Sequence, residues 1–392
     1  MTVFLYASVR DRASNCDGPS KCGLTYFRRS VVIGVSRQTG QGRAARRTGR
    51  VRRLTSETLE QRLCLTLEPV QLLPDPVGPQ QLGEWNYAVD ITDQYRAVGT
   101  PEALDGSAFD VGFVSVYDAS NELFAAIPNP EPQENDEFGG AVALSGQLLA
   151  VSAEYNHVAG VDATGTVYVY DLGSPTPTIP VWTLTHPNPA PFDRFGNSLG
   201  FSGQTLAVGS YTSDGTENDA GDVFIFDLAG ATPTVPAFEI PNPDPGAQDW
   251  FGYSVDLDGD ILVVGALLDD VGRPDSGSAH VFDLASTTPT VPIARLEQPN
   301  AELQFAGAVA VSGDLVLVGS RLDRIGGNQQ SGGVYLYDLA SPTPETFQLA
   351  IQNPEPGFGD QFGYALDLHG QTAVVGSWLD SPGGLNAAGS AY

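Results

Sequence analysis

Residues 251–265, Phe251-Gly-Tyr-Ser-Val-Asp-Leu-Asp-Gly-Asp-Ile-Leu-Val-Val-Gly265, decide the fold class of this chain. Apolar and polar residues alternate first, Asp258-Gly259 is a two-residue hairpin signal, and a valine-rich return strand follows. The same reading predicts a third and a fourth strand, over 277–283 and 293–297. Four antiparallel strands in about 55 residues is the size of one propeller blade.

The pattern recurs six times between residue 85 and the C-terminus, at intervals of 53 to 57 residues. The openings are Trp85-Asn86, Phe138-Gly139, Phe195-Gly196, Phe251-Gly252, Phe305-Ala306 and Phe362-Gly363. A period of this size indicates blades or a solenoid. No helical 3.6-residue pattern intervenes, so the chain is predicted to be all-β.

The predicted third strands carry aromatic residues on one pleat face and aliphatic residues on the other, as in Val167-Tyr-Val-Tyr170 and Val223-Phe-Ile-Phe226. Both faces of each sheet must therefore be covered. A ring of stacked sheets does this, because each sheet buries its two faces against its neighbours. The sequence predicts a β-propeller of four-stranded antiparallel blades.

The two ends of the repeat region bear on ring closure. The last copy, 362–392, supplies two strands and the start of a third, whereas 70–76 looks like an orphan fourth strand. Joining them hides two open sheet edges and gives six blades closed by an N-terminal strand. The alternative is an incomplete seven-bladed ring.

Charge divides the chain into two parts. Residues 1–64 hold 13 of the 19 Lys and Arg and only four acids, while 65–392 hold six Arg, no Lys and 43 acids, a net charge of about −37. The basic part lacks periodicity and is predicted to be a disordered or export segment. Residues 65–392 are predicted to form one propeller domain without disulfides, because Cys16, Cys22 and Cys64 precede it.

The acidity of 65–392 also limits the partners. It repels phosphate backbones and anionic headgroups, which need Lys and Arg, so a nucleic-acid partner is not expected. No stretch approaches 18 apolar residues, so membrane insertion is not expected. Residues 50–66 resemble the Arg-rich segment at the start of large exported bacterial surface proteins, which implies a secreted or cell-surface location. A protein or a glycan remains as the partner, and the oligomeric state is left open.

Phe-Gly, then Val-Gly-Ala or Val-Gly-Ser, then Gly-x-Val-Tyr-Val-Tyr resembles the FG-GAP repeat of the integrin alpha-chain propeller. The resemblance covers 85–392 and is weakest in the first copy, where Trp85-Asn86 and Val98-Gly99-Thr100 replace the usual pairs. It implies an extracellular adhesion or recognition module, usually of seven blades and often calcium-binding. The six copies here depart from that number.

Calcium is a candidate cofactor, and two places have carboxylates for it. The integrin-like loop Asp-x-Asp-x-Asp-Gly survives only as a fragment, with Asp256, Asp258 and Asp260, which also reads as a plain hairpin. The second place is the connection between the second and third strands, with Asp214 and Asp219 in one copy and Asp269, Asp270 and Asp275 in the next. Acidic loops can also serve solvation alone.

Strand direction places the variable loops on one side, which we call the loop face: the connections from second to third strands and those between blades. Its candidate partner-binding residues mix aromatic, Arg and acidic side chains: Tyr155, His157, Tyr211, Asp214, Asp270, Arg273, Arg321 and Trp378. The four histidines share no position in the repeat, and no phosphate-loop, zinc-protease or nucleophile-elbow motif occurs. No catalytic residue is therefore predicted.

The sequence thus predicts a non-catalytic recognition or adhesion module that binds a protein or glycan through its loop face. Two alternatives stay open. A propeller-scaffold hydrolase requires His and carboxylates gathered at the central channel, and a calcium-stabilised structural protein requires a higher melting temperature in calcium than in chelator.

Overall fold

The repeat that opens at Phe251 folds into four antiparallel strands, in the order β15 (Phe251–Asp258), β16 (Ile261–Ala266), β17 (Ser278–Asp283) and β18 (Ala294–Glu297). In this computed structural model the described residues are 7–15, 23–31, 88–103, 110–215, 217–298, 304–324, 330–381 and 387–392. The turn between β15 and β16 contains Gly259 with a φ of +61°, as the Asp-Gly hairpin signal predicts.

Four further sheets repeat this arrangement, and the sixth blade has three strands among the described residues. The first comprises β3 (Val89–Ile91), β4 (Tyr95–Thr100), β5 (Phe113–Asp118) and β6 (Leu123–Pro128). The second comprises β7 (Val142–Ser145), β8 (Leu148–Ala153), β9 (Thr166–Asp171) and β10 (Trp182–Thr185), and the third β11 (Leu199–Ser202), β12 (Thr205–Ser210), β13 (Asp222–Asp227) and β14 (Phe238–Pro241). The fifth comprises β19 (Phe305–Ser312), β20 (Leu315–Ser320), β21 (Gly333–Asp338) and β22 (Leu349–Gln352), and the sixth β23 (Phe362–His369), β24 (Thr372–Ser377) and β25 (Ser390–Ala391).

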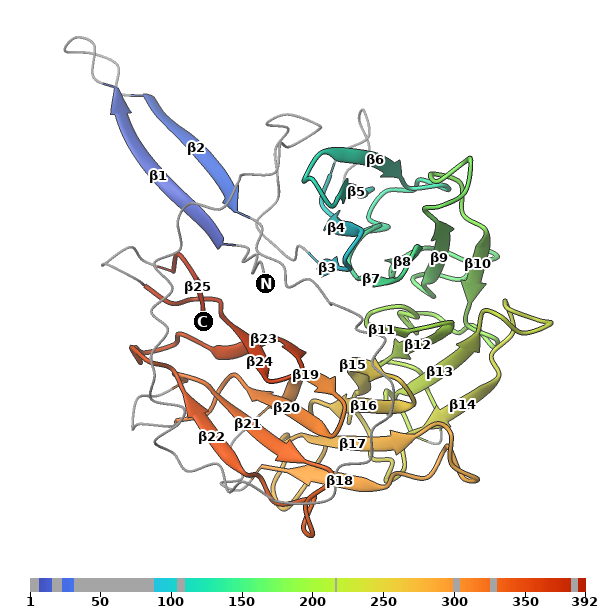
Figure 1. The fold of residues 1–392 in the computed structure, drawn as a ribbon, viewed down its shortest axis with the longest axis vertical. Helices are drawn as coiled ribbons and strands as arrows, with labels where there is room; N and C mark the ends of the chain where they lie inside the picture. Colours follow the sequence, from blue (N-terminus) through green and yellow to red (C-terminus); the bar gives the residue numbers. More distant parts are fainter. Residues whose placement is uncertain are drawn as a thin grey trace, which may run out of the picture.

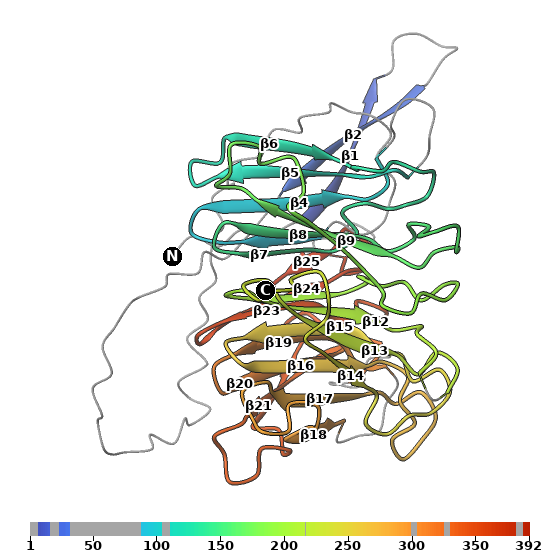
Figure 2. The ribbon, with the colours of Figure 1, turned by 90° about the vertical axis from the view of Figure 1, so that its right-hand side faces the viewer.

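The six sheets stand around a common centre as the blades of a propeller (Figure 1). The first strand of each blade lies innermost, where β11 contacts β15, β15 contacts β19 and β19 contacts β23. Fourth strands such as β14 and β18 lie at the rim, and the side view shows the blades layered beside one another (Figure 2). The all-β, six-bladed prediction is confirmed, and no described residue is helical.

Apolar side chains fill the space between neighbouring blades. Phe138, at the start of blade two, is fully buried against Val114 and Ile127 of blade one and Tyr168 of its own blade. Its ring centroid lies 5.9 Å from that of Tyr168 in an edge-to-face arrangement. The Phe of each Phe-Gly pair is therefore a wedge between blades.

A glycine before each third strand allows this close approach. Gly221 has a φ of +83°, and a Cβ added to it would lie 2.0 Å from the carbonyl oxygen of Phe251 in the next blade. The Phe251 amide donates to the Ala220 carbonyl at 3.0 Å across the same contact. The equivalent glycines in four other blades are equally crowded by the next Phe: Gly112, Gly165, Gly277 and Gly332.

In the basic N-terminal part, β1 (Ala7–Asn15) pairs with β2 (Gly23–Val31) as an antiparallel hairpin, where the sequence shows no strand periodicity. Backbone hydrogen bonds form such a ladder without apolar alternation. The predicted closing strand, 70–76, and the first opening, Trp85-Asn86, lie outside the described residues. None of the described segments is a helix with the length and apolar character needed to cross a bilayer.

Candidate functional site

Two positions of the repeat bring functional side chains to the centre of the loop face. One directly follows the second strand, and the other flanks the Phe-Gly pair. One position lies at the end of a second strand and the other at the start of a first strand, so copies from neighbouring blades lie in contact. The residues that gather there, which we call the inner cluster, are Tyr155, Arg194, Tyr211, Trp250, Tyr253, Arg321, Tyr364 and Trp378.

Arg194 lies between two tyrosine rings. Its guanidinium carbon is 4.8 Å from the ring centroid of Tyr155 and 5.5 Å from that of Tyr211, within the range of cation–π attraction. Nη1 donates a hydrogen bond to the Tyr211 hydroxyl, whereas the buried Nε makes none. The side chain is thus held in place with donor capacity left unused.

Three aromatic rings continue the inner cluster from Tyr211. Its ring centroid lies 5.3 Å from that of Trp250 and 5.4 Å from that of Tyr253, both in edge-to-face contact. Trp250 and Tyr253 are stacked with an angle of 11° between their planes. Tyr211 is buried and the other two are half-buried, so part of each outer ring remains accessible.

The other half of the inner cluster comes from blades five and six. Arg321 lies 5.6 Å above the Tyr364 ring centroid, and its Nε donates to Gln304 Oε1 at 3.0 Å. Tyr364 contacts Trp378 at 5.0 Å between ring centroids. Burial, with a smaller contribution from Tyr253 of blade four, raises the pKa of Tyr364.

Two glutamates accompany Arg194. Burial raises the pKa of Glu154 to about 7, and the neighbouring Glu137 adds to that shift while Arg194 opposes it. Burial likewise raises the pKa of Glu137 to about 7. Both carboxyls therefore exchange protons near neutral pH, where most carboxyls are fully ionised.

We expect the protein to be more stable at about pH 5 than at about pH 8. Burial raises the pKa of Asp193 and Asp222 to about 6 and of Glu137 and Glu154 to about 7. The folded state therefore holds more protons than the unfolded chain in this range, so stability falls as pH rises towards 7. His186, whose pKa burial lowers, opposes the trend as a single group. Thermal unfolding across this pH range measures the slope.

The variant Glu154→Gln provides the control for this pH dependence. The substitution removes one carboxyl whose pKa is raised, so the melting temperature of the variant should vary less with pH than that of the wild type. At about pH 8 the variant should have the higher melting temperature of the two. A wild-type melting temperature that is equal or lower at about pH 5 would contradict the assignment.

The other predicted loop-face residues lie in the outer loops. His157 and Asp270 are exposed; His157 Nδ1 lies 3.2 Å from Asp162, and Asp270 Oδ1 accepts from the Asp275 amide at 3.0 Å. Asp214 accepts from the Asp219 amide in the same way, and Arg273 is exposed. The sequence prediction thus combined two groups of residues that the structure separates. Tyr155, Tyr211, Arg321 and Trp378 belong to the inner cluster. The outer-loop residues do not: His157, Asp214, Asp270 and Arg273.

The acids of the hairpin fragment connect blades. Asp256 Oδ2 accepts from the Val311 amide at 2.7 Å, and Asp258 Oδ2 accepts from the Gly313 amide at 2.8 Å. Asp260 is exposed. Among the described residues, no three His, Cys, Asp or Glu side chains form a group that could hold a metal ion. Calcium binding stays a prediction, which the melting temperature in calcium and in chelator tests.

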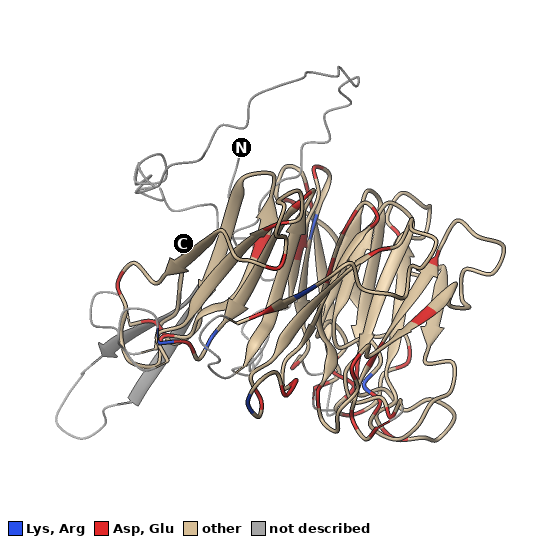
Figure 3. Ribbon diagram, turned by 90° about the horizontal axis from the view of Figure 1, so that it is seen from below, with Lys and Arg blue, Asp and Glu red and all other residues tan. Residues whose placement is uncertain are grey.

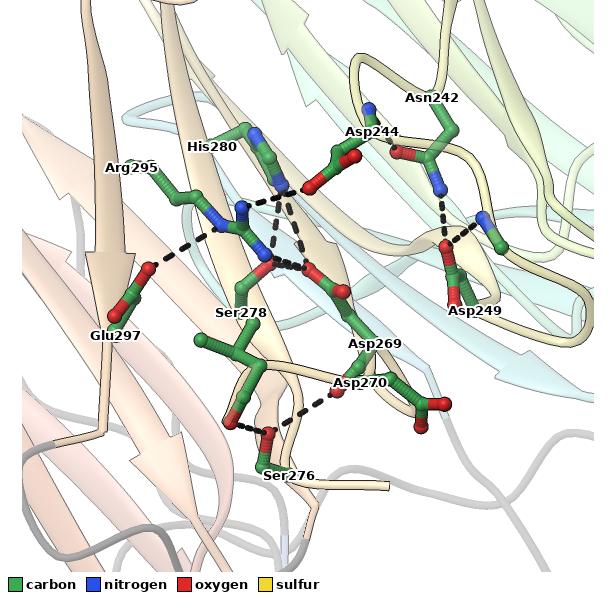
Figure 4. Close-up of polar contacts among 12 residues, drawn as sticks. Asn242, Asp244, Asp249, Asp269, Asp270, Ser276, Ser278, His280, Arg295 and Glu297 are labelled. Carbon is green, nitrogen blue, oxygen red and sulfur yellow. Dashed lines mark hydrogen bonds and ion pairs between the residues drawn. The ribbon is translucent and has the colours of Figure 1, made fainter. Parts of the chain in front are cut away.

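Asp269, the remaining candidate ligand, is buried in a polar network (Figure 4). Arg295 Nη2 lies 2.9 Å from Asp269 Oδ2, and the Ser278 hydroxyl donates to the same oxygen. Burial alone would raise the pKa of Asp269, but hydrogen bonds from His280 and Ser278 and the charge of Arg295 outweigh it, so the pKa is lowered. This carboxylate joins a loop to β17 and β18.

A second buried group has the residue types of a catalytic triad. His186 Nδ1 lies 3.6 Å from Asp193, and its Nε2 lies 3.5 Å from Ser213 Oγ. Ser213 is 4% exposed and donates its hydroxyl to Asp222 at 2.6 Å. The hydroxyl is therefore turned to a carboxylate and shielded from a substrate, which fits a structural role.

Sequence reasoning missed four members of the inner cluster, which are Arg194, Trp250, Tyr253 and Tyr364. They adjoin the Phe-Gly pairs, which the sequence marks as scaffold. Their position in the repeat could have identified them, because each lies one residue before the Phe of a Phe-Gly pair or two residues after it. Figure 3 shows the acidic residues chiefly in loops and at strand ends, with few Lys or Arg residues among them.

Comparison with known proteins agrees with this repeat structure. The FG-GAP repeat family matches 126–170, 181–226, 240–282, 299–337 and 353–392. No curated protein matches the chain. Among solved structures, that of Raptor from Chaetomium thermophilum is similar with a TM-score of 0.44 and 14% identity, over 73% of this chain and 22% of that one.

Proposed function

The chain belongs to the FG-GAP repeat family, and on that premise we propose that it is a non-catalytic recognition module that binds a protein or glycan through its loop face. The contact centre is the inner cluster. The secreted or cell-surface location indicated by residues 50–66 stays a prediction.

The inner cluster is the observation that carries this proposal. Tyr, Trp and Arg are the side chains most enriched at binding centres, because each joins a large contact surface to a polar tip. Here they come from five blades and are ordered by one another, as in the Arg194 contacts to Tyr155 and Tyr211. Side chains held in place before binding lose less entropy when the ligand arrives.

The position of the cluster supports the same function. Loops carried on a rigid scaffold tolerate sequence change without loss of the fold. The buried networks around Asp269 and Asp193 hold the bases of these loops. The fold can therefore keep its blades constant while the cluster residues determine which ligand binds.

The double variant in which both Trp250 and Trp378 are replaced by Ala should lose ligand binding. The experiment is an array of glycans and proteins probed with the full chain, followed by affinity measurement for each retained ligand. We expect each single variant to weaken binding at least about tenfold, because a central aromatic residue contributes about 1.4 kcal/mol or more.

The matched control is Phe358→Ala, which removes a ring that is 79% exposed in the connection leading to β23. It should leave both affinity and thermal unfolding unchanged. If the Trp variants keep wild-type affinity while retaining the wild-type melting temperature, the inner cluster is not the contact centre.

A further inference from the structure

We propose that the ligand of the inner cluster is a saccharide bearing a carboxylate, with Arg194 or Arg321 binding the carboxylate and the aromatic rings stacking on the sugar. This rests on the proposed function, since it names the ligand class of the same site. The proposal follows from the absence of ion pairs at the two arginines, the geometry of the aromatic rings and the net charge of 65–392.

Both arginines lack a carboxylate partner. Among the described residues, no Asp or Glu oxygen lies within ion-pair distance of Arg194 or Arg321. Arg295 contrasts with them, because its guanidinium meets Asp269, Asp244 and Glu297. Glu137 and Glu154 lie near Arg194 without forming an ion pair with it, and Arg321 packs on Tyr364. In a region with 43 acids and six arginines, two arginines that pack on aromatic rings and form no ion pair indicate a site for an external anion.

The guanidinium groups have donors available for that anion. The Arg194 Nε is buried without a hydrogen bond, and Nη1 donates to the Tyr211 hydroxyl. Arg321 uses Nε for Gln304 and has its two terminal nitrogens for other partners. A planar guanidinium binds a carboxylate through two parallel hydrogen bonds, which makes this pairing strong and directional.

The rings are suited to a sugar. The flat C–H face of a sugar packs on an aromatic ring, while its hydroxyl edge needs hydrogen-bond partners. Trp250 and Tyr253 are stacked and half-buried, so part of each ring is accessible to a sugar face, and the Tyr211 hydroxyl and the two arginines supply polar groups beside them.

The negative charge of the domain limits how many negative charges a bound ligand can carry. A net charge of about −37 on 65–392 repels a polyanion over long range, but salt screens this field beyond about 8 Å. An ion pair between a ligand carboxylate and Arg194 or Arg321 acts at shorter range, so it can form in spite of this repulsion. An otherwise neutral glycan with one or a few carboxylates therefore fits better than a sulfated or phosphorylated polymer.

The test measures the affinity of the full chain for short oligosaccharides containing glucuronate, galacturonate or a sialic acid. Each is paired with its methyl ester, which keeps the shape and removes the charge. We expect at least one acid to bind at least about tenfold more tightly than its ester, as charged hydrogen bonds contribute about 1.5 kcal/mol or more. At least one of Arg194→Gln and Arg321→Gln should remove this difference.

Arg273→Gln is the charge-matched control, because Arg273 is an exposed arginine in an outer loop. It should keep the preference for the acid. Thermal unfolding of each variant separates lost contact from lost fold, and Arg321→Lys should recover only part of the preference, because Lys lacks the planar fork.

Several results would overturn this inference. They are equal affinity for acid and ester, a preference that persists in both Gln variants, binding of acidic peptides in place of sugars, or no binding by any member of the panel. A neutral glycan or a protein bound through Trp250 and Trp378 would overturn the inference and leave the proposed function standing. Both fail if every ligand found is insensitive to the inner cluster.

Discussion

Gly221→Ala should destabilise the protein by about 4 kcal/mol. A Cβ at this position would lie 2.0 Å from the Phe251 carbonyl oxygen, and the φ of +83° is itself unfavourable for alanine. The clash is with backbone of the next blade, so no side-chain rotation relieves it. The two blades must separate, which weakens the hydrogen bond from the Phe251 amide to the Ala220 carbonyl. Urea unfolding measures the loss.

Gly203→Ala is the control, since Gly203 also has a positive φ, +61°, but nothing lies within 4 Å of an added Cβ. It should cost about 1 kcal/mol, the backbone strain alone. If the two variants lose equal stability, backbone conformation explains both, and crowding between blades does not limit this position.

Phe195→Ala should destabilise the protein by about 3 to 5 kcal/mol, because it opens a cavity between blades two and three. Phe195 is fully buried, with its ring centroid 5.7 Å from that of Phe224 and 6.0 Å from that of Phe226. Val167 of blade two belongs to the same cluster. Since both blades use this ring, neither can collapse onto the space without moving the other. Denaturant unfolding again gives the free energy.

Phe192→Ala is the matched control in the same connection. Its ring is 58% exposed, so the substitution should change the free energy of unfolding by about 0.5 kcal/mol or less. A comparable loss in both variants would show that the connection, and not the wedge between blades, is sensitive to substitution.

The blade itself could be predicted from the sequence because its signals are local. Alternation before Asp258-Gly259 and the apolar run after it define a hairpin, and β15 and β16 lie where these signals place them. Repetition then gave six blades, because each apolar face needs a neighbour. The hairpin of β1 and β2 was not predicted, since a ladder of backbone hydrogen bonds leaves little trace in side-chain pattern.

Half of the inner cluster could be predicted, and the reason is where each residue stands in the repeat. Tyr155, Tyr211, Arg321 and Trp378 occupy a loop that varies between copies, which drew attention to them. Trp250 adjoins an invariant-looking Phe-Gly pair and reads as part of the scaffold. Asp269 was predicted as a candidate calcium ligand in a loop, and the sequence could not show its buried contacts with Arg295 and Ser278.

The sequence by itself determined the strands of the repeat, the propeller class and the acidic composition of 65–392, because these depend on neighbours along the chain and on composition. The structure decided between six blades and an incomplete seven-bladed ring. Only the tertiary structure decided which side chains face one another near the axis. Tyr211 and Trp250 belong to different blades and lie in edge-to-face contact, since closing blades into a propeller brings these positions together. The same closure brought Asp256 into a hydrogen bond between blades, and it placed Arg194 and Arg321 on aromatic rings.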